Sequence, residues 1–504
     1  MTWNHVLDSL RRTALVVAIV AGVSASTAPL TYYVDVTAPA GGGGGMADPF
    51  NSITAAVSAL NLNAAVGQNE GTLAIADGTY SIAGETFGAN GIEITKYMTI
   101  KGGYAGSGDW SEAGRVPRSS VIDLNGANTR AFYQNTPSHW TMGSTFDGLT
   151  FQNANHTLAG GAIGGAGGWA VGMSINDCLF QNNTTTASGG AVYLAGTAAG
   201  TLLRNSDFVN NHADAQGGAL CWTPSYAFTH LVENCTFEGN AAGTGGAIHV
   251  TTGANSDATA RIEGCVFEGN TATANGGALF SPDGAGNDPI AVRQSRFTGN
   301  SAPRGAAIGG ADYWHGEYYL ENCLVAGNLG GYAITASGYR VLNDYAVDIV
   351  HSTIVDNPGG GISVTYNGEA SDLGVRVRDS IVANNGAVGV HFNRNGGTGT
   401  AVLEYNDVWG QASNYLGDAA AGAGAMSVDP GFKASGGEAY TLGTSSPLID
   451  AGTNLGIAVD LLGLARPDGA GYAMGAFEVP VPEPSALTLL AAAGLAAFVR
   501  RRQA

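Results

Sequence analysis

A recurring column of side chains is of the kind that contacts sugars. Tyr193, Cys221, His249 and Phe280 each follow Gly-Gly-Ala and one aliphatic residue, at nearly equal intervals along the chain. On a strand they have the opposite parity to the preceding aliphatic residue, so they point outward if that residue points into a core. Exposed rings in a row suit a sugar chain, and Cys221 beside His249 has the composition of a nucleophile and its base. The alternative is a packing ladder beneath a loop.

Two neighbouring segments offer further candidates. "ADYWHGEYYLEN" contains Tyr313 and Trp314, which we predict as ligand-binding residues with the same alternative. "SPDGAGNDP" contains Asp283 and Asp288, whose oxygens suit Ca²⁺, although the segment is first of all typical of a polar turn. We therefore predict no cofactor, and leave a structural calcium ion open.

Two pairs of carboxylates have the composition of catalytic groups. Glu233 and Glu263, like Glu238 and Glu268, are equivalent positions in neighbouring repeats, and stacking places them about 5 Å apart, near the spacing of a retaining glycosidase. Duplication creates such pairs automatically, so we interpret them as a solvated face. We assign no catalytic residue and no metal ligand, and expect a protein that is not an enzyme.

These side chains recur because the chain repeats. "ENCTFEGNAAGTGGAIHV" begins at Glu233, and a near copy, "EGCVFEGNTATANGGALF", begins at Glu263. A marker position can be followed further in both directions at a nearly constant spacing, and self-similarity at a fixed period is typical of solenoids. The marker residues are Leu149, Cys178, Ser206, Cys235, Cys265, Ser295, Cys323, Ser352, Ser380 and Asn406. Because serine replaces cysteine freely, this column predicts a small buried side chain.

Three more columns describe one copy. An apolar residue, usually Phe, lies two positions after the marker, and Asn follows three positions later. Asn, Asp or Gly precedes the marker and predicts a bend with positive φ. Each copy then reads as short strands joined by tight corners. Stacked copies place Phe on Phe and Asn on Asn at about 4.8 Å, which predicts a parallel β-helix.

The F-x-x-N and G-G-A-(I/V/L) signatures resemble the repeats of chlamydial polymorphic membrane proteins and, more broadly, right-handed pectin-lyase-like β-helices. The resemblance implies an all-β, right-handed parallel β-helix over residues 126–415. Each of its regular coils, about ten in all, corresponds to one repeat of the sequence. Gly114 to Arg118, "GRVPR", resembles a pectate-lyase element, but we interpret it as a chance match.

The flanks differ from the repeats. Residues 29–125 read as a cap, with Asn51 or Ser52 beginning a helix, and as irregular first coils. Residues 416–480 resemble the choice-of-anchor Q segment. The matching positions are Ser446, Pro447, Asp450, Gly452, Asp460, Gly463, Arg466, Gly475 and Glu478. We expect Asp450, Asp460 and Arg466 to form a structural ion-pair network.

Both ends read as targeting signals. In residues 1–28, Arg11 and Arg12 precede an apolar run and small residues, as in a secretory signal peptide. In residues 481–504, a short apolar run lies between a proline-rich motif and a basic cluster, and it is shorter than a stable membrane span requires. The residues of this signal are Pro482, Glu483, Pro484, Arg500, Arg501 and Arg502. They resemble the PEP-CTERM signal, which implies an exosortase partner, a Gram-negative bacterium and transient anchoring in the inner membrane.

Composition limits the function. Of 504 residues 78 are glycine, about twice the usual ~7%, and the net charge is −19. A surface this acidic repels nucleic acid. We therefore expect a monomeric, exported surface or matrix protein that presents a rigid face for adhesion or glycan contact, with exopolysaccharide as a candidate partner. The alternative is a secreted polysaccharide lyase or glycoside hydrolase.

Overall fold

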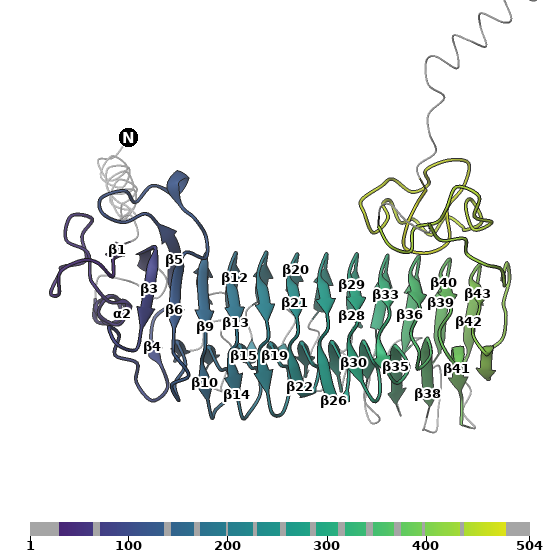
Figure 1. Ribbon diagram of the computed structural model, residues 1–504, viewed down its shortest axis with the longest axis horizontal. Coiled ribbons are helices and arrows are strands. Elements are labelled where there is room, and N and C mark those ends of the chain that lie inside the picture. The colour runs from purple at the N-terminus through teal and green to yellow at the C-terminus, as the bar shows by residue number, and fades with distance from the viewer. Residues whose placement is uncertain are drawn as a thin grey trace, which may run out of the picture.

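The computed structural model describes most of the chain. The described residues are 30–63, 71–135, 143–165, 172–197, 200–224, 229–251, 259–282, 289–310, 318–338, 346–366, 374–395, 399–433 and 438–479. They form a long solenoid of parallel strands with one α-helix near its N-terminal end (Figure 1). The prediction of an all-β stack of about ten regular coils is confirmed.

Strands stack in chain order into four parallel sheets. The first sheet has 13 strands: β1 (Leu30–Val34), β2 (Gly71–Ala76), β5 (Met98–Tyr104), β8 (Gly143–Asp147), β12 (Gly172–Asn176), β16 (Leu202–Arg204), β20 (Thr229–Glu233), β24 (Thr259–Glu263), β28 (Ile290–Arg293), β32 (Tyr318–Glu321), β36 (Val347–Val350), β39 (Val375–Arg378) and β42 (Ala401–Glu404).

The second sheet has 12 strands: β3 (Gly78–Ser81), β6 (Ser120–Asp123), β9 (Leu149–Gln152), β13 (Leu179–Gln181), β17 (Asp207–Val209), β21 (Thr236–Glu238), β25 (Val266–Glu268), β29 (Arg296–Thr298), β33 (Leu324–Ala326), β37 (Thr353–Val355), β40 (Ile381–Ala383) and β43 (Asp407–Trp409). The third sheet has seven short strands: β10 (Asn155–His156), β14 (Thr184–Thr185), β18 (His212–Ala213), β22 (Ala241–Thr244), β26 (Thr271–Asn275), β30 (Ser301–Ala302) and β34 (Leu329–Gly330).

The fourth sheet has 12 strands: β4 (Ile92–Ile94), β7 (Phe132–Gln134), β11 (Ile163–Gly165), β15 (Val192–Thr197), β19 (Leu220–Pro224), β23 (Ile248–Val250), β27 (Leu279–Ser281), β31 (Ile308–Gly310), β35 (Ile334–Gly338), β38 (Ile362–Tyr366), β41 (Val388–Asn393) and β44 (Ser413–Gly417). A regular coil visits the four sheets in turn, as β12, β13, β14 and β15 do.

The phenylalanine column forms the centre of the core. Phe180, Phe208, Phe237, Phe267 and Phe297 are fully buried, and successive rings stack with centroids 4.6–4.9 Å apart and planes within 5° of parallel. Identical side chains in register fill the same space in every coil, so the interior is closely packed from coil to coil. The predicted stacking of Phe on Phe is confirmed.

The asparagine column is a continuous buried amide ladder. Asn270 is representative: its Nδ2 donates to Phe237 O and to Asn300 Oδ1, both at 2.9 Å, while its Oδ1 accepts from the Nδ2 and the backbone N of Asn240. The ladder begins where Ala154 N donates to Asn183 Oδ1 and ends at Gln411, which accepts from Asn385 N. Each amide thus satisfies polar groups at a corner that water does not reach.

The marker column is buried, as its Cys–Ser exchange predicts. Cys265 N donates to Ser295 Oγ at 3.1 Å, and Ser295 Oγ donates to Arg293 O at 2.7 Å. The residue before the marker has the predicted positive φ; Asn234, for example, has a φ of 52°. At the Gly-Gly corner the coils approach so closely that a Cβ on Gly218 would lie 2.1 Å from Gly246 O.

The N-terminal end has the predicted helix. In α2 (Ile53–Leu62), Ser52 rather than Asn51 is the N-cap, and its Oγ accepts from Ala55 N at 3.1 Å. The helix buries Ile53, Val57 and Leu60 in the same core as the strands, and contacts β1, β2 and β4. The sequence "GTLAIADGTYSI" forms β2 and β3 as expected.

The C-terminal segment, residues 418–479, folds back onto the side of the last coils (Figure 1). Its Leu448, Met474 and Phe477 form an apolar cluster with Leu324, Val355, Ile381 and neighbours on the outer face of the second sheet. In earlier coils many of the equivalent outer positions are polar, as at Asp207 and Glu238, although Val266 and Leu179 are apolar. The outer face therefore becomes apolar where this segment covers it.

The expected ion-pair network in this segment has different members. Arg466 Nη1 pairs with Glu478 Oε1 at 2.7 Å, and both side chains are buried. Asp460 instead accepts from the backbone N of Leu462, Leu464 and Glu478, and Asp450 accepts from Gly471 N. Both aspartates are thus occupied by backbone N–H groups, and Glu478 is the carboxylate that pairs with the Arg466 guanidinium.

Candidate functional site

The aromatic column lies on the outer face of the fourth sheet. On neighbouring strands of this sheet Tyr193 pairs with Cys221, Cys221 with His249, and His249 with Phe280. The same column continues through Gly309, Thr335, Ser363 and His391, which the sequence prediction did not include. We call these eight residues the outer column.

The first half of the outer column is more buried than predicted. His249 is 1% exposed and Phe280 7% exposed, and their ring centroids lie 5.2 Å apart. Tyr193 is half-buried. The outward parity of His249 and Phe280 does not leave them exposed, because their rings pack on each other as in the packing-ladder alternative. Binding by these residues stays a prediction.

Cys221 and His249 do not form a nucleophile and base. Both ring nitrogens of His249 are occupied, by Thr244 Oγ1 at 3.0 Å and by Thr251 Oγ1 at 2.8 Å. Burial lowers the pKa of His249 to about 4 and raises the pKa of the Cys221 thiol to about 12. A thiol with such a pKa is almost entirely protonated at neutral pH and is a weak nucleophile.

The second half of the outer column borders a hollow. Gly309 has no side chain at the position that follows Phe280 in the outer column, and the next two residues, Thr335 and Ser363, are small and polar. A hollow of about 150 Å³ lies here, lined by Pro303, Arg304, Gly331, Tyr332, Thr335, Ala336, Ser337, Ser363 and Thr365. Four aliphatic hydroxyls on β35 and β38 thus lie near the Tyr332 side chain and the Arg304 guanidinium. This composition suits a polyhydroxylated ligand.

Two features mark the hollow as chemically unusual. Thr335 Oγ1 is buried but has no hydrogen-bond partner in the structure. Ser363 Oγ lies 3.1 Å from His391 Nδ1, and the His391 ring stacks on Tyr332 with centroids 6.1 Å apart. Desolvation lowers the pKa of His391, so its imidazole is neutral at pH 7 and can accept a proton.

The carboxylates weighed as a catalytic pair lie elsewhere. Glu233 and Glu263 are neighbours on the outer face of the first sheet, where Glu233 pairs with Arg204 at 2.7 Å and Glu263 pairs with Arg261 and Arg293. Arg293 reaches on to Glu321 at 3.4 Å. These carboxylates belong to a ladder of alternating charges, which agrees with the solvated-face interpretation.

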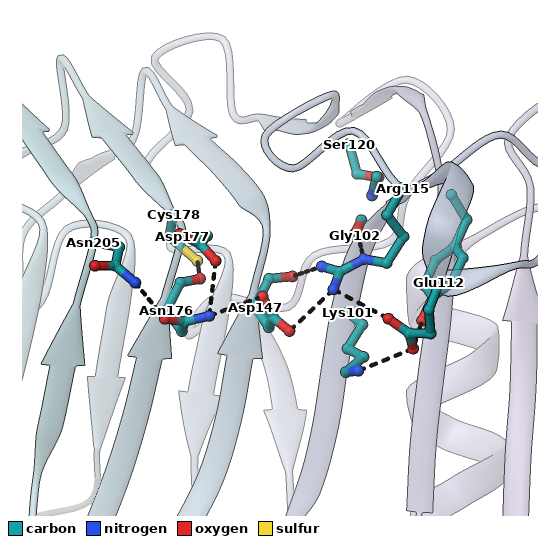
Figure 2. A network of polar contacts seen from close by, with 12 residues as sticks. Lys101, Gly102, Glu112, Arg115, Ser120, Asp147, Asn176, Asp177, Cys178 and Asn205 are labelled. Carbon is teal, nitrogen blue, oxygen red and sulfur yellow. Dashed lines mark hydrogen bonds and ion pairs between the residues drawn. The ribbon is translucent and has the colours of Figure 1, made fainter.

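The "GRVPR" segment contacts several neighbouring coils at their corners. Arg115 Nη1 pairs with Asp147 at 3.2 Å and with Glu112 at 3.4 Å, and its Nε donates to Gly102 O (Figure 2). Glu112 lies in η1 (Glu112–Gly114) and also accepts from Lys101 Nζ. Figure 2 shows Asn176 and Asn205 extending this network along successive strands.

Arg118 continues the same contacts one coil further. Its Nη1 pairs with Asp207 at 2.5 Å, its Nη2 donates to Asn205 O, and its Nε donates to Asp177 O. Both arginines thus make contacts that join the first irregular coils to the regular ones. The segment fastens coils together, which agrees with the interpretation of its sequence as a chance match.

Several predicted residues lie outside the described part of the chain. They are Tyr313, Trp314, Asp283, Asp288, the signal-peptide residues 1–28 and the sorting residues Pro482, Glu483, Pro484, Arg500, Arg501 and Arg502. Among the described residues, no group of three or more His, Cys, Asp or Glu side chains has the arrangement of a metal site. Within the same ranges no helix is long and apolar enough to span a membrane.

Sequence reasoning missed Tyr332, Thr335, Ser363 and His391, although a signal exists. Ala333-Ile334-Thr335, Gly361-Ile362-Ser363 and Gly389-Val390-His391 repeat the pattern of a small residue, a branched aliphatic residue and an outward side chain. The signal was overlooked because the preceding Gly-Gly pair becomes irregular beyond residue 330.

Comparison with known proteins agrees with the fold. Residues 217–410 match the right-handed β-helix region, residues 177–195 match the Chlamydia polymorphic membrane protein repeat, and residues 480–503 match the PEP-CTERM protein-sorting motif. No match was found among curated proteins. The resemblance of residues 416–480 to choice-of-anchor Q has no counterpart among these matches.

The solved structures that match this chain do so at low sequence identity and low TM-score. They include the pectate lyase Pel9A (13% identity, 91% of this chain and 98% of that chain, TM-score 0.35) and ORF18 of Geobacillus virus E2 (14%, 79% and 60%, TM-score 0.30). A third is the A-module of the Azotobacter vinelandii mannuronan C-5 epimerase AlgE4 (12%, 78% and 97%, TM-score 0.29). The chain thus contains a right-handed β-helix region and a PEP-CTERM motif. This motif indicates export and surface sorting by an exosortase in Gram-negative bacteria.

Proposed function

We propose that the protein is a surface or matrix β-helix that binds a glycan in the hollow on the fourth sheet. The observation that carries the proposal is the lining of the hollow, where the hydroxyls of Thr335, Ser363 and Thr365 lie with the ring of Tyr332. Hydroxyls donate to and accept from sugar hydroxyls, and an aromatic ring offers an apolar face to a sugar ring. Thr335 Oγ1 has no partner, so a ligand can supply its missing hydrogen bond.

The charge of the chain restricts the ligand. With a net charge of −19 the protein repels polyanions at a distance, so nucleic acid and uronic acid polymers are poor ligands. A neutral or amino-sugar polymer, such as a bacterial exopolysaccharide, meets no such barrier. Tyr193 extends the same face toward the N-terminus and is a candidate outer contact.

The position of the hollow supports a surface role. The C-terminal segment lies over one edge of the solenoid, whereas β35, β38 and β41 lie along the opposite edge (Figure 1). Val479, the last described residue before the sorting signal, is packed in the apolar cluster of the C-terminal segment. In this proposal residues 481–504 hold the monomer transiently in the inner membrane before it is released to the outside. During that attachment the hollow would face away from the membrane.

The proposal does not include cleavage of glycosidic bonds. Lyases and retaining glycosidases use carboxylates or basic groups that are free to reach the sugar. Glu233 and Glu263 are held by Arg204, Arg261 and Arg293 on the first sheet. Glu238 and Glu268 are exposed neighbours on the second sheet, so neither pair lies on the sheet of the hollow. We therefore place the protein among glycan-binding proteins and leave lyase or hydrolase action as the alternative for the test below.

A glycan array followed by calorimetry on the purified exported protein tests this function. We expect weak binding of a neutral or amino-sugar oligosaccharide, lost in Tyr332→Ala and retained in Thr236→Val, which alters an outward threonine on the second sheet. The same oligosaccharides are analysed for new reducing or unsaturated ends. Such ends would favour the lyase or hydrolase alternative, and binding that is unaffected by Tyr332→Ala would contradict the hollow as the site.

A further inference from the structure

The hollow contains an arrangement that suits acyl transfer. Ser363 lines it, and the Ser363 Oγ is in contact with His391 Nδ1 at 3.1 Å on the next strand of the fourth sheet. A serine hydroxyl next to a neutral imidazole is the basic unit of a nucleophile activated by its base. His391 is not one of the residues that line the hollow, so a ligand there would contact Ser363, which is in turn in contact with His391.

The surroundings hold this pair in place. Tyr332 stacks on the His391 ring with an interplanar angle of 28°, which restricts rotation of the imidazole plane. Ser363 and His391 both lie on strands of one continuous sheet, so their separation is set by the backbone ladder and not by a loop. Desolvation lowers the pKa of His391 and keeps the ring unprotonated, as a base must be.

Thr335 supplies a third group. It precedes Ser363 by one coil in the outer column, and adjacent strands are about 4.8 Å apart. Thr335 lines the hollow, and its Oγ1 is buried and has no hydrogen-bond partner in the structure. A hydroxyl in that state can donate to negative charge that develops on a carbonyl oxygen attacked by Ser363.

From these observations we propose that the protein hydrolyses O-acyl esters on glycans, with Ser363 as nucleophile, His391 as base and Thr335 as oxyanion donor. This inference rests on the proposed function, because the glycan that binds in the hollow would be the alcohol part of the ester. It concerns an ester bond and not the glycosidic bond. The acyl groups that fit a hollow of about 150 Å³ beside a sugar are small, such as acetyl.

The reaction balances with water as the second substrate. Ser363 Oγ attacks the ester carbonyl carbon while its proton passes to His391, and the carbonyl oxygen becomes an oxyanion near Thr335. The bond from the carbonyl carbon to the sugar oxygen then breaks, and the sugar oxygen takes the proton from His391. Water next attacks the acyl-Ser363 ester and gives a proton to His391. Ser363 leaves with that proton, which releases the carboxylic acid.

Active-site labelling tests the proposal on the purified exported protein. A biotinylated fluorophosphonate and 4-nitrophenyl acetate are the probes. We expect covalent labelling at Ser363, identified by peptide mass, and turnover of the ester. Ser363→Ala should abolish both, and His391→Asn should slow labelling by at least about 100-fold. Ser301→Ala, on β30 of the third sheet, is the matched control and should behave as the wild type.

Thr335→Val separates chemistry from packing. Removal of one oxyanion donor should lower kcat by about 100-fold with little change in KM. Equal labelling and turnover in Thr335→Val and the wild type would overturn its role as a donor. Melting temperatures of all variants show whether each is folded.

The outcomes separate this inference from the proposed function. Glycan binding without labelling of Ser363 would refute the esterase and leave the binding function intact. Labelling at a different serine would also refute it. Absence of both glycan binding and labelling in the folded wild type would refute both proposals.

Discussion

The stacked phenylalanines allow a sharp test of how the coils are held together. Phe237 is fully buried, and its ring lies between those of Phe208 and Phe267 with centroids 4.9 Å away on both sides and planes within 5° of parallel. Burial of a Phe side chain in a core contributes about 3–5 kcal/mol relative to Ala. The coil spacing is set by backbone hydrogen bonds, so the two neighbouring rings cannot move together to fill the hole. We therefore expect Phe237→Ala to cost about 4 kcal/mol.

Guanidinium-induced unfolding of the exported protein measures this cost. Circular dichroism and tryptophan fluorescence should be followed together, because coincident transitions are needed for a two-state free energy in a repeat protein. Thr236→Ala, one residue earlier on β21 and facing outward, is the matched control and should change the free energy of unfolding by less than about 0.5 kcal/mol. A loss below about 1 kcal/mol in Phe237→Ala would show that the ring is not an inward member of a tight stack.

Four other perturbations have defined outcomes. Asn270→Ala removes the hydrogen-bond partner of Asn240 Nδ2 and of Phe237 O inside the ladder. The change should lower the free energy of unfolding by about 2–5 kcal/mol. An effect no larger than that of an exposed Asn→Ala change would contradict the ladder. Asp407→Asn tests a buried carboxyl, because burial raises the pKa of Asp407 to about 6. Between about pH 4 and pH 6 the folded state keeps a proton that the unfolded state releases, so the wild type loses stability as the pH rises through this range. The variant keeps an oxygen that accepts from Val428 N, so it should melt higher than the wild type at pH 8 and show no such gain at pH 4; a gain independent of pH would be inconsistent with this titration. Glu478→Gln leaves the buried Arg466 without its counter-ion and should destabilise the C-terminal segment by about 3–5 kcal/mol. The expected readout is faster limited proteolysis after residue 418, and unchanged proteolysis would show that the ion pair does not hold this segment on the coils. Deletion of residues 482–504 should release the protein into the medium with unchanged circular dichroism, whereas misfolding would show that this segment is structural.

The regular coils could be predicted because each column has one physical requirement. Phe at 237 and 267, Asn at 240 and 270, and a positive-φ residue at 234 and 264 recur since each is stacked on its own copy and has the same neighbours. Identical surroundings select identical residues, so the pattern is visible in a single sequence. The helix cap at Ser52 follows a local rule in the same way.

The rest depends on contacts that are distant in sequence. Arg466 reaches Asn322, and Thr453 donates to Asp379, so the C-terminal segment is placed by partners 74 to 144 residues away. Both partners are of residue types that recur at this position, as at Asp177, Asn205 and Asn234, so their type does not reveal the contact. The hollow also has no strong signal in the sequence. It arises because Gly309 follows Phe280 in the outer column and small residues with hydroxyl groups come next. The exposure of Phe280 was overestimated since strand parity shows direction but not what lies above the ring.

The central claim is that the outer face of the fourth sheet, at the hollow, is where this β-helix contacts a glycan. A crystal structure of the exported protein with the tightest oligosaccharide from the array tests it most directly. We expect one sugar ring against Tyr332, with a sugar hydroxyl hydrogen-bonded to Thr335 Oγ1. A sugar bound along the charged ladder of the first sheet, with the hollow empty, would contradict the claim.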